Sequence, residues 1–277
     1  MTKPPTPYPD LNAVLRELVI SVRAALSDIF VGSYLHGSFA TGGFDRDSDV
    51  DFVIAIEHEL SEAQLHSLQA THARIHGRDS YWAQHLEGSY FPRDVLKRHA
   101  PVGGHLWYLD NGSRSLIRSD HDDTVVVRWT LREHGVVLAG PSPTALIDPI
   151  PVLSLLKEVV ATMRNWGQQL LTQPDCMNNR WYQPFAVLSY CRMMHTLQTG
   201  TVGSKPAAVQ WAKEALDARW AGLIQRAWDE RPNQYRKILQ PADPDDFRST
   251  QEFIKYAIIA SEHYPGDLPP EQTHPTG

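Results

Sequence analysis

The stretch from Gly37 to Asp51 holds the residues of this chain that are best suited to chemistry. It reads Gly-Ser-Phe-Ala-Thr-Gly-Gly-Phe-Asp-Arg-Asp-Ser-Asp-Val-Asp, a Gly-Ser turn followed by two carboxylates one residue apart. Residues 31–35 predict a short buried strand before the turn, and residues 49–56 alternate with the period of a second strand. Asp49 and Asp51 then share one face of that strand. The alternate apolar side chains are expected to point into a core: Val50, Phe52, Ile54 and Ile56.

Two carboxylates on one face of a strand, roughly 7 Å apart, repel each other unless a cation lies between them. Magnesium fits this place, because it takes oxygen ligands and is usually held by one or two carboxylates together with substrate phosphates. We expect the backbone N–H groups of the Gly37-Ser38 turn, and the hydroxyls of Ser38 and Ser48, to face a triphosphate. The alternative is a solvated, Asp-rich turn that leads into an edge strand.

These residues resemble the signature of the polymerase-beta-like nucleotidyltransferase superfamily. A later segment, residues 185–212, contains Leu188-Ser-Tyr-Cys-Arg192 and Gly203-Ser-Lys-Pro206. It resembles the C-terminal helical domain of the aminoglycoside adenylyltransferases, the streptomycin and spectinomycin resistance enzymes. The resemblance implies Mg²⁺-dependent transfer of AMP from ATP to a hydroxyl of an aminoglycoside-type antibiotic, with release of pyrophosphate.

A third carboxylate is expected on a strand beside the Asp pair, because transfer to a hydroxyl needs a group that accepts its proton. Glu87, in Leu-Glu-Gly-Ser-Tyr, is the best placed candidate. The resemblance implies that Glu87 is the general base. Glu87 could equally be a third metal ligand, or an exposed strand residue without a catalytic role.

Two basic residues of the later segment are unusual for purely structural positions. Arg192 interrupts an apolar helix, and a buried guanidinium needs an anionic partner. Lys205 follows Ser204, a candidate N-cap, where the helix dipole disfavours a cation. A bound phosphate would account for both, and the resemblance implies that both contact the triphosphate; Tyr235 is a weaker candidate nucleotide contact. The alternatives are an intramolecular ion pair for Arg192 and a solvated Lys205.

The acceptor is less constrained by the sequence. In the resembling family, use of streptomycin is associated with an Asp near the start of the arginine-bearing helix and with a Trp in the N-terminal domain. Residues 180–183 here read Arg-Trp-Tyr-Gln, without a carboxylate, and residues 109–114 lack the Trp, with Trp107 only nearby. We therefore expect spectinomycin, or an acceptor that is not an antibiotic. A protein hydroxyl and a nucleotide sensor without catalysis are further alternatives, and the intact acidic residues argue against the sensor.

Composition sets wider limits. A net charge of −6, with no run of Lys and Arg, argues against a nucleic-acid surface and suits a small cationic substrate. We expect neither a secretory signal nor a membrane span, because the first residues and the rest of the sequence lack the necessary apolar runs. The two cysteines, Cys176 and Cys191, suit a reducing compartment. We expect a cytoplasmic monomer. Its thirteen histidines contain no closely spaced ligand set, so we expect no zinc site.

The elements that must position these residues follow from periodicity and turn signals. Helix patterns begin at Asp10, a candidate N-cap, and at Ser61, while residues 81–90 and 106–109 suggest strands. Asp120 and Asp122 precede the apolar run 124–131, where we prefer helix capping to substrate contact. These segments predict a small mixed sheet with packed helices.

A proline-rich connection near Pro149 precedes a part of the chain with helical patterns only. Its expected helices cover residues 153–171, 181–199, 205–217, 220–228 and 247–263. The sequence thus predicts an α+β protein with a nucleotidyltransferase domain over residues 1–149 and an all-α helical bundle over residues 150–265. Residues 266–277 are expected to form a disordered tail.

Overall fold

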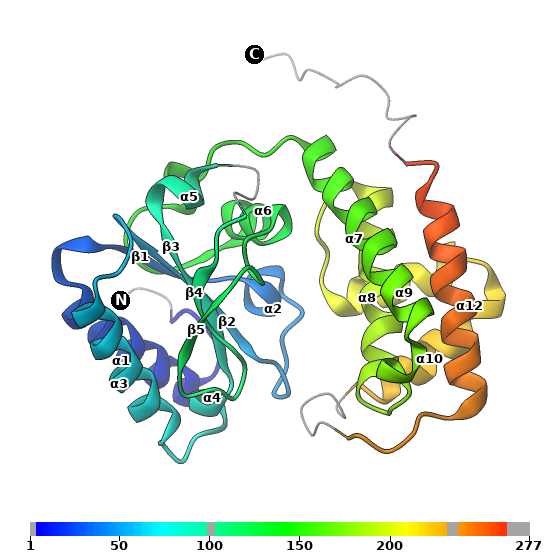
Figure 1. Ribbon diagram of the computed structural model, residues 1–277, viewed down its shortest axis with the longest axis horizontal. Helices are drawn as coiled ribbons and strands as arrows, with labels where there is room; N and C mark the ends of the chain where they lie inside the picture. Colours follow the sequence, from blue (N-terminus) through cyan, green and yellow to red (C-terminus); the bar gives the residue numbers. More distant parts are fainter. Residues whose placement is uncertain (1–3, 99–102, 232–237, 265–277) are drawn as a thin grey trace. The chain divides into compact units, whose positions relative to one another are not determined.

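The computed structural model describes residues 4–98, 103–231 and 238–264 (Figure 1). The chain divides into two compact units, Met1–Ser154 and Leu155–Gly277. The first unit is a mixed sheet with helices and the second is helical, so the predicted α+β class is confirmed.

The first unit alternates helices and strands along the chain. Its helices are α1 (Pro9–Leu26), α2 (Gly37–Thr41), α3 (Glu62–His76), α4 (Tyr81–Gln84), α5 (Arg93–Lys97) and α6 (Val125–His134), with short 3₁₀ turns at Ser27–Ile29 and Pro143–Ala145. Its strands are β1 (Phe30–Leu35), β2 (Val50–Ile56), β3 (Leu86–Pro92), β4 (Leu106–Leu109), β5 (Leu116–Ser119) and β6 (Val136–Ala139).

The six strands form one sheet in the order β5-β4-β3-β2-β1-β6. The pairing of β2 with β3 is parallel and the other four pairings are antiparallel. Alternate side chains of β2 enter different cores, as the strand period requires. The even-numbered apolar residues predicted to face a core, from Val50 to Ile56, pack with α1 and α3, so that prediction is confirmed. Val53 and Ala55 face the other side, where they pack with residues of α5 and α6.

Local sequence signals account for the helix starts. Ser61 caps α3 through a capping box with Gln64, which satisfies backbone donors at both positions. Asp10, by contrast, is not an N-cap: α1 begins at Pro9, whose missing N–H suits the first helical position. The Asp10 carboxylate instead accepts a hydrogen bond from Trp82 Nε1, at 2.9 Å.

Three further features of this unit differ from the sequence analysis. Residues 81–84 form the single helical turn α4, not the start of a strand, because pairing with β2 begins only at Leu86. The Trp82 side chain of this turn is buried against Tyr8 and Phe39. The strands β5 and β6 were not predicted; each has four residues and is held by pairing with β4 or β1. Asp120 and Asp122 do not cap α6, because Thr124 is its N-cap and accepts a hydrogen bond from Val127 N.

The second unit contains the helices expected from the sequence. These are α7 (Val152–Thr172), α8 (Tyr182–Thr199), α9 (Lys205–Ala215), α10 (Ala221–Asp229) and α12 (Pro244–Ser261), with 3₁₀ turns at Pro174–Met177 and Ala218–Trp220. Helix α8 packs against α9, α10 and α12. A buried hydrogen bond from Gln183 to Thr250 (2.7 Å) joins α8 to α12. The expected disordered tail, residues 266–277, lies outside the described residues.

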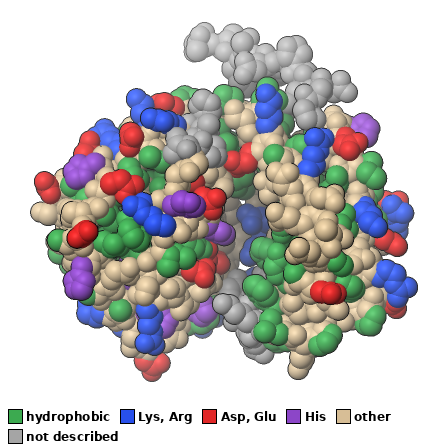
Figure 2. Space-filling model, viewed as in Figure 1, with side chains coloured by type: hydrophobic (Ala, Val, Ile, Leu, Met, Phe, Trp, Pro, Cys, Tyr) green, Lys and Arg blue, Asp and Glu red, His purple; other side chains and the backbone are tan. Residues whose placement is uncertain are grey.

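Charged side chains of both signs are interspersed over each unit, among the described residues on the face that Figure 2 shows. No described helix combines the length and the apolar character needed to cross a membrane.

Candidate active site

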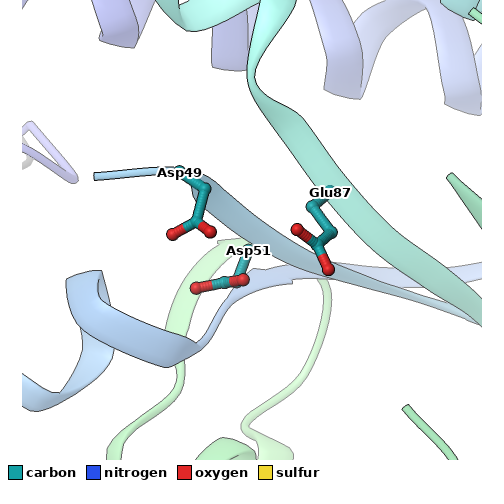
Figure 3. A group of neighbouring side chains, drawn as sticks. All are labelled: Asp49, Asp51 and Glu87. Carbon is teal, nitrogen blue, oxygen red and sulfur yellow. The ribbon is translucent and has the colours of Figure 1, made fainter. Parts of the chain in front are cut away.

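Three carboxylates of the first unit converge in one place, as Figure 3 shows: Asp49, Asp51 and Glu87. Each offers an oxygen atom, and these oxygens all lie within 4.8 Å of one another. Asp51 and Glu87 are register partners across the parallel pair β2 and β3, so their side chains project from the same face of the sheet. Asp49 precedes the first residue of β2 and lies beside them. The structure thus brings together the three acidic residues that the sequence singled out.

Gly37 lets the chain pass close to Asp51. It opens α2 directly after β1, with φ at +55°, a left-handed conformation that favours glycine. A Cβ atom at this position would lie 1.8 Å from Asp51 Oδ2. The backbone N–H of His36 also donates a hydrogen bond to the Asp51 carbonyl oxygen, at 3.0 Å. The Gly-Ser motif therefore packs directly against one of the three carboxylates.

The acidic cluster is electrostatically unfavourable without a cation. Burial, together with the charges of Asp51 and Asp49, raises the pKa of Glu87 to about 9. Mg²⁺ and similar hard cations prefer oxygen ligands such as these three neighbouring carboxylates. A bound cation would favour the ionised form of all three groups. The residues present therefore fit a divalent metal ion.

Two residues that sequence analysis did not identify contact Glu87. The hydroxyl of Tyr108, on β4, donates a hydrogen bond to Glu87 Oε1 at 2.5 Å. His121 Nε2 lies 3.4 Å from the same oxygen. For Tyr108 a signal was present: it lies on the predicted aromatic strand 106–109, and strand alternation places it on one face. For His121, which follows β5 in a loop, no comparable signal exists.

The hydroxyls expected to face a triphosphate differ in their surroundings. Ser38 lies in the first turn of α2, and its buried Oγ has no hydrogen-bond partner among the described residues. The Ser48 hydroxyl is buried and holds a turn, accepting a hydrogen bond from Asp45 N (2.9 Å) and donating one to Asp45 Oδ1 (3.2 Å). Ser38 is thus the hydroxyl whose hydrogen-bonding capacity is unused.

The basic candidates belong to the second unit. Arg192 is on α8 and is partly buried, and Lys205 is the first residue of α9. Ser204 caps α9 as expected, accepting a hydrogen bond from Ala207 N. Tyr235 lies outside the described residues. The nucleotide-binding roles of these residues remain predictions.

Two protein families match parts of the chain. Residues 19–92 match the nucleotidyltransferase domain, and residues 145–257 match the aminoglycoside adenylyltransferase C-terminal domain. The first match contains Gly37, the acidic triad and the strands that carry it. The second contains Arg192 and Lys205.

Curated relatives are similar over most of their length. An aminoglycoside (3'') (9) adenylyltransferase of Shigella flexneri is 23% identical over 89% of this chain and 93% of the relative. One of Rhizobium radiobacter is 28% identical, over 81% and 84%. A spectinomycin 9-adenylyltransferase of Staphylococcus aureus is 23% identical, over 77% and 84%.

A solved structure has the same fold. It is the spectinomycin adenyltransferase of Enterococcus faecialis, determined with ATP and spectinomycin. The similarity has a TM-score of 0.64 at 14% sequence identity and covers 90% of this chain and 98% of that one.

Proposed function

We propose that this chain, a member of the aminoglycoside adenylyltransferase family of nucleotidyltransferases, transfers AMP from ATP to a hydroxyl of spectinomycin. The reaction would require Mg²⁺ and release pyrophosphate. The observation that carries the proposal is the acidic triad, whose three carboxylate oxygens lie within 4.8 Å of one another beside the Gly-Ser motif.

Each residue of the triad has a role that its position favours. Asp49 and Asp51 would hold the metal ion, which when bound neutralises charge that develops on the phosphates. Glu87 would act as the general base that accepts the proton of the acceptor hydroxyl, and it could at the same time be a third ligand of the metal ion. The Ser38 hydroxyl, which lacks a hydrogen-bond partner among the described residues, would donate to a phosphate oxygen.

Arg192 and Lys205 would supply positive charge to the triphosphate. Lys205 opens a capped helix of eleven residues, whose N-terminal N–H groups favour an anion. The chemistry requires little from the protein beyond orientation of the reacting groups and stabilisation of charge on the departing pyrophosphate.

We propose spectinomycin rather than streptomycin as the acceptor, because the start of α8 has, among the described residues, no unpaired carboxylate that could bind a guanidinium group of streptomycin. Residues 180–183 contain no carboxylate, and the nearby Glu230 carboxylate forms an ion pair with Arg180 at 2.9 Å. Streptomycin carries two guanidinium groups, and residues 180–183 offer it no carboxylate as an ionic partner.

Pyrophosphate release from ATP and Mg²⁺ tests the proposal. Purified protein would be assayed with spectinomycin, with streptomycin and with other aminoglycosides, and the isosteric variant Glu87→Gln would serve as the control. We expect release with spectinomycin and wild-type protein only, together with an antibiotic product heavier by one AMP. Pyrophosphate release with streptomycin alone would reject spectinomycin as the acceptor. If none of the antibiotics stimulates pyrophosphate release, the proposed function is rejected.

A further inference from the structure

The Oε1 oxygen of Glu87 is held by side chains from two other segments. Tyr108 approaches from β4, where its register partner is Ser89, two residues beyond Glu87 on the same face of β3. Its hydroxyl lies 2.5 Å from Oε1 and 3.3 Å from Asp110 Oδ1, so the shorter hydrogen bond is the one to Glu87. A hydrogen bond of this length to a carboxylate is among the stronger kinds in proteins.

His121 reaches the same oxygen from the loop between β5 and α6. Its Nε2 atom lies 3.4 Å from Oε1, and its ring lies against that of Tyr108, with 5.1 Å between the ring centroids. The side chain of His121 is 61% exposed, so burial alone does not fix its position. Its position depends on its contacts with Glu87 and Tyr108 and on the loop that carries it.

Two buried polar contacts anchor this loop directly after His121. Asp122 Oδ2 accepts a hydrogen bond from Ser89 Oγ at 2.7 Å, which ties the loop to β3, the strand that carries Glu87. Asp123 Oδ1 accepts one from Arg128 Nη2 at 2.5 Å, and both side chains are almost fully buried. Buried carboxylates are costly unless they are paired, so the two anchors constrain the loop closely.

We propose that Tyr108 and His121 are positioning residues that hold Glu87 Oε1 and thereby direct Oε2 toward the metal ion and the acceptor hydroxyl. This inference rests on the proposed function. A glutamate side chain has three rotatable bonds, and hydrogen bonds from neighbouring groups are a common means of orienting a carboxylate ligand. The loop of residues 120–124, between β5 and α6, is then part of the active site.

The variant Tyr108→Phe tests the inference, because it removes the hydroxyl and keeps the ring. Binding of Mn²⁺, measured by electron paramagnetic resonance, is followed alongside kcat and the KM for ATP. We expect Mn²⁺ affinity or kcat to fall about 10-fold or more, with the KM for ATP nearly unchanged. The matched control is Tyr34→Phe, which also loses a hydrogen-bonded hydroxyl, to the Pro141 carbonyl, in the same unit.

Variants of His121 separate positioning from a general effect on folding. His121→Ala should lower Mn²⁺ affinity or kcat, and His121→Gln, whose amide can donate to Oε1, should restore part of the loss. Wild-type values for both Tyr108→Phe and His121→Ala would overturn the inference. If the wild-type protein modifies no antibiotic, the proposed function fails, and the Mn²⁺ titration still decides whether Tyr108 and His121 position Glu87.

Discussion

Asp51 and Glu87 occupy facing positions on β2 and β3, the one parallel pair among the strands that the structure describes. Partner residues of a parallel pair project to the same face, so the pairing itself places the two carboxylates side by side. The register fixes the backbone positions of both residues, so their side chains leave neighbouring strands at the same level. The sheet thus brings the two negative charges close together, and either protonation of Glu87 or a bound cation would reduce their repulsion.

Removal of one charge from the triad should strongly reduce activity and leave the fold intact. Asp51→Asn keeps the shape of the side chain but weakens a ligand of the proposed metal ion, and a bound metal ion contributes several kcal/mol of charge stabilisation. We expect kcat for pyrophosphate release to fall at least about 100-fold, since each 1.4 kcal/mol corresponds to a factor of ten. Asp79→Asn, at an exposed position, is the control and should retain full activity. An active Asp51→Asn enzyme would exclude Asp51 from the metal site.

Gly37→Ala should disrupt the site by a steric route. The new Cβ would lie 1.8 Å from Asp51 Oδ2, so the carboxylate or α2 must move. A misplacement of reacting groups by about 1 Å can lower a rate about 100-fold. Gly42→Ala is a matched control, because Gly42 also has a positive φ, at +77°, but a Cβ there meets no atom within 4 Å. Both variants should lose about 1–2 kcal/mol of stability from backbone strain, and only Gly37→Ala should lose activity.

Glu87 should make the metal-free protein less stable as the pH rises. Its pKa is about 9 in the folded protein, against an ordinary value of 4.5, so between these values the folded state holds more protons than the unfolded chain. The contribution of Glu87 to stability is full below about pH 4.5 and is lost as the pH rises to about 9, by at most about 1.4 kcal/mol per pH unit.

Unfolding by urea from pH 5 to pH 9, without metal, compares wild-type protein with Glu87→Gln. The variant should become the more stable of the two as the pH rises, and Mg²⁺ should narrow the difference by stabilising the wild type. His72, whose pKa burial lowers to about 4, is present in both proteins and cancels in the difference. Parallel stability curves would show that Glu87 is ionised at neutral pH without a cation.

Lys205→Ala should weaken the use of ATP more than the chemical step, if Lys205 contacts the triphosphate as proposed. A hydrogen bond to a charged group contributes about 1.5–3 kcal/mol, so the KM for ATP should rise about 10-fold or more. Lys213→Ala is the control, because Lys213 is a second lysine of α9 that donates a hydrogen bond to Gln225. Equal KM values in both variants would reject a role for Lys205.

Sequence reasoning was most successful where one segment carries the whole signal. The alternation of residues 49–56 was enough to place Asp49 and Asp51 opposite a buried face, and helix periodicity gave α7 to within one residue at each end. The capping box at Ser61 is likewise a local pattern. Such features depend on residues a few positions apart, which a sequence shows directly.

Features that depend on distant contacts were missed. The four-residue strands β5 and β6 have too little pattern of their own, and only pairing within the sheet defines them. Tyr108 and His121 become part of the site because β4 and the loop after β5 are laid against β3. Asp122 was read as a helix cap for the same reason, since its partner, Ser89, is far away in the sequence.

The ion pair between Arg128 and Asp123 should be essential for the stability of the first unit. Both side chains are buried, with 0% and 1% of their surface exposed, and the Arg128 guanidinium also donates to the carbonyl oxygens of Val95 and Thr124. Loss of one partner from a buried pair leaves a charge uncompensated and costs about 3–5 kcal/mol. Asp123→Asn should therefore lower the free energy of unfolding by about 3 kcal/mol or more, measured by urea denaturation.

The comparison pair is Arg93 and Glu57, which are 3.2 Å apart but each about half exposed. Glu57→Gln should change the free energy of unfolding by less than about 1 kcal/mol, because water screens exposed charges. Asp123→Asn should also lower kcat, since Asp123 anchors the loop that holds His121 against Glu87. If Asp123→Asn is as stable as Glu57→Gln, then Arg128 is satisfied by the two carbonyl oxygens alone, and the loop needs another anchor.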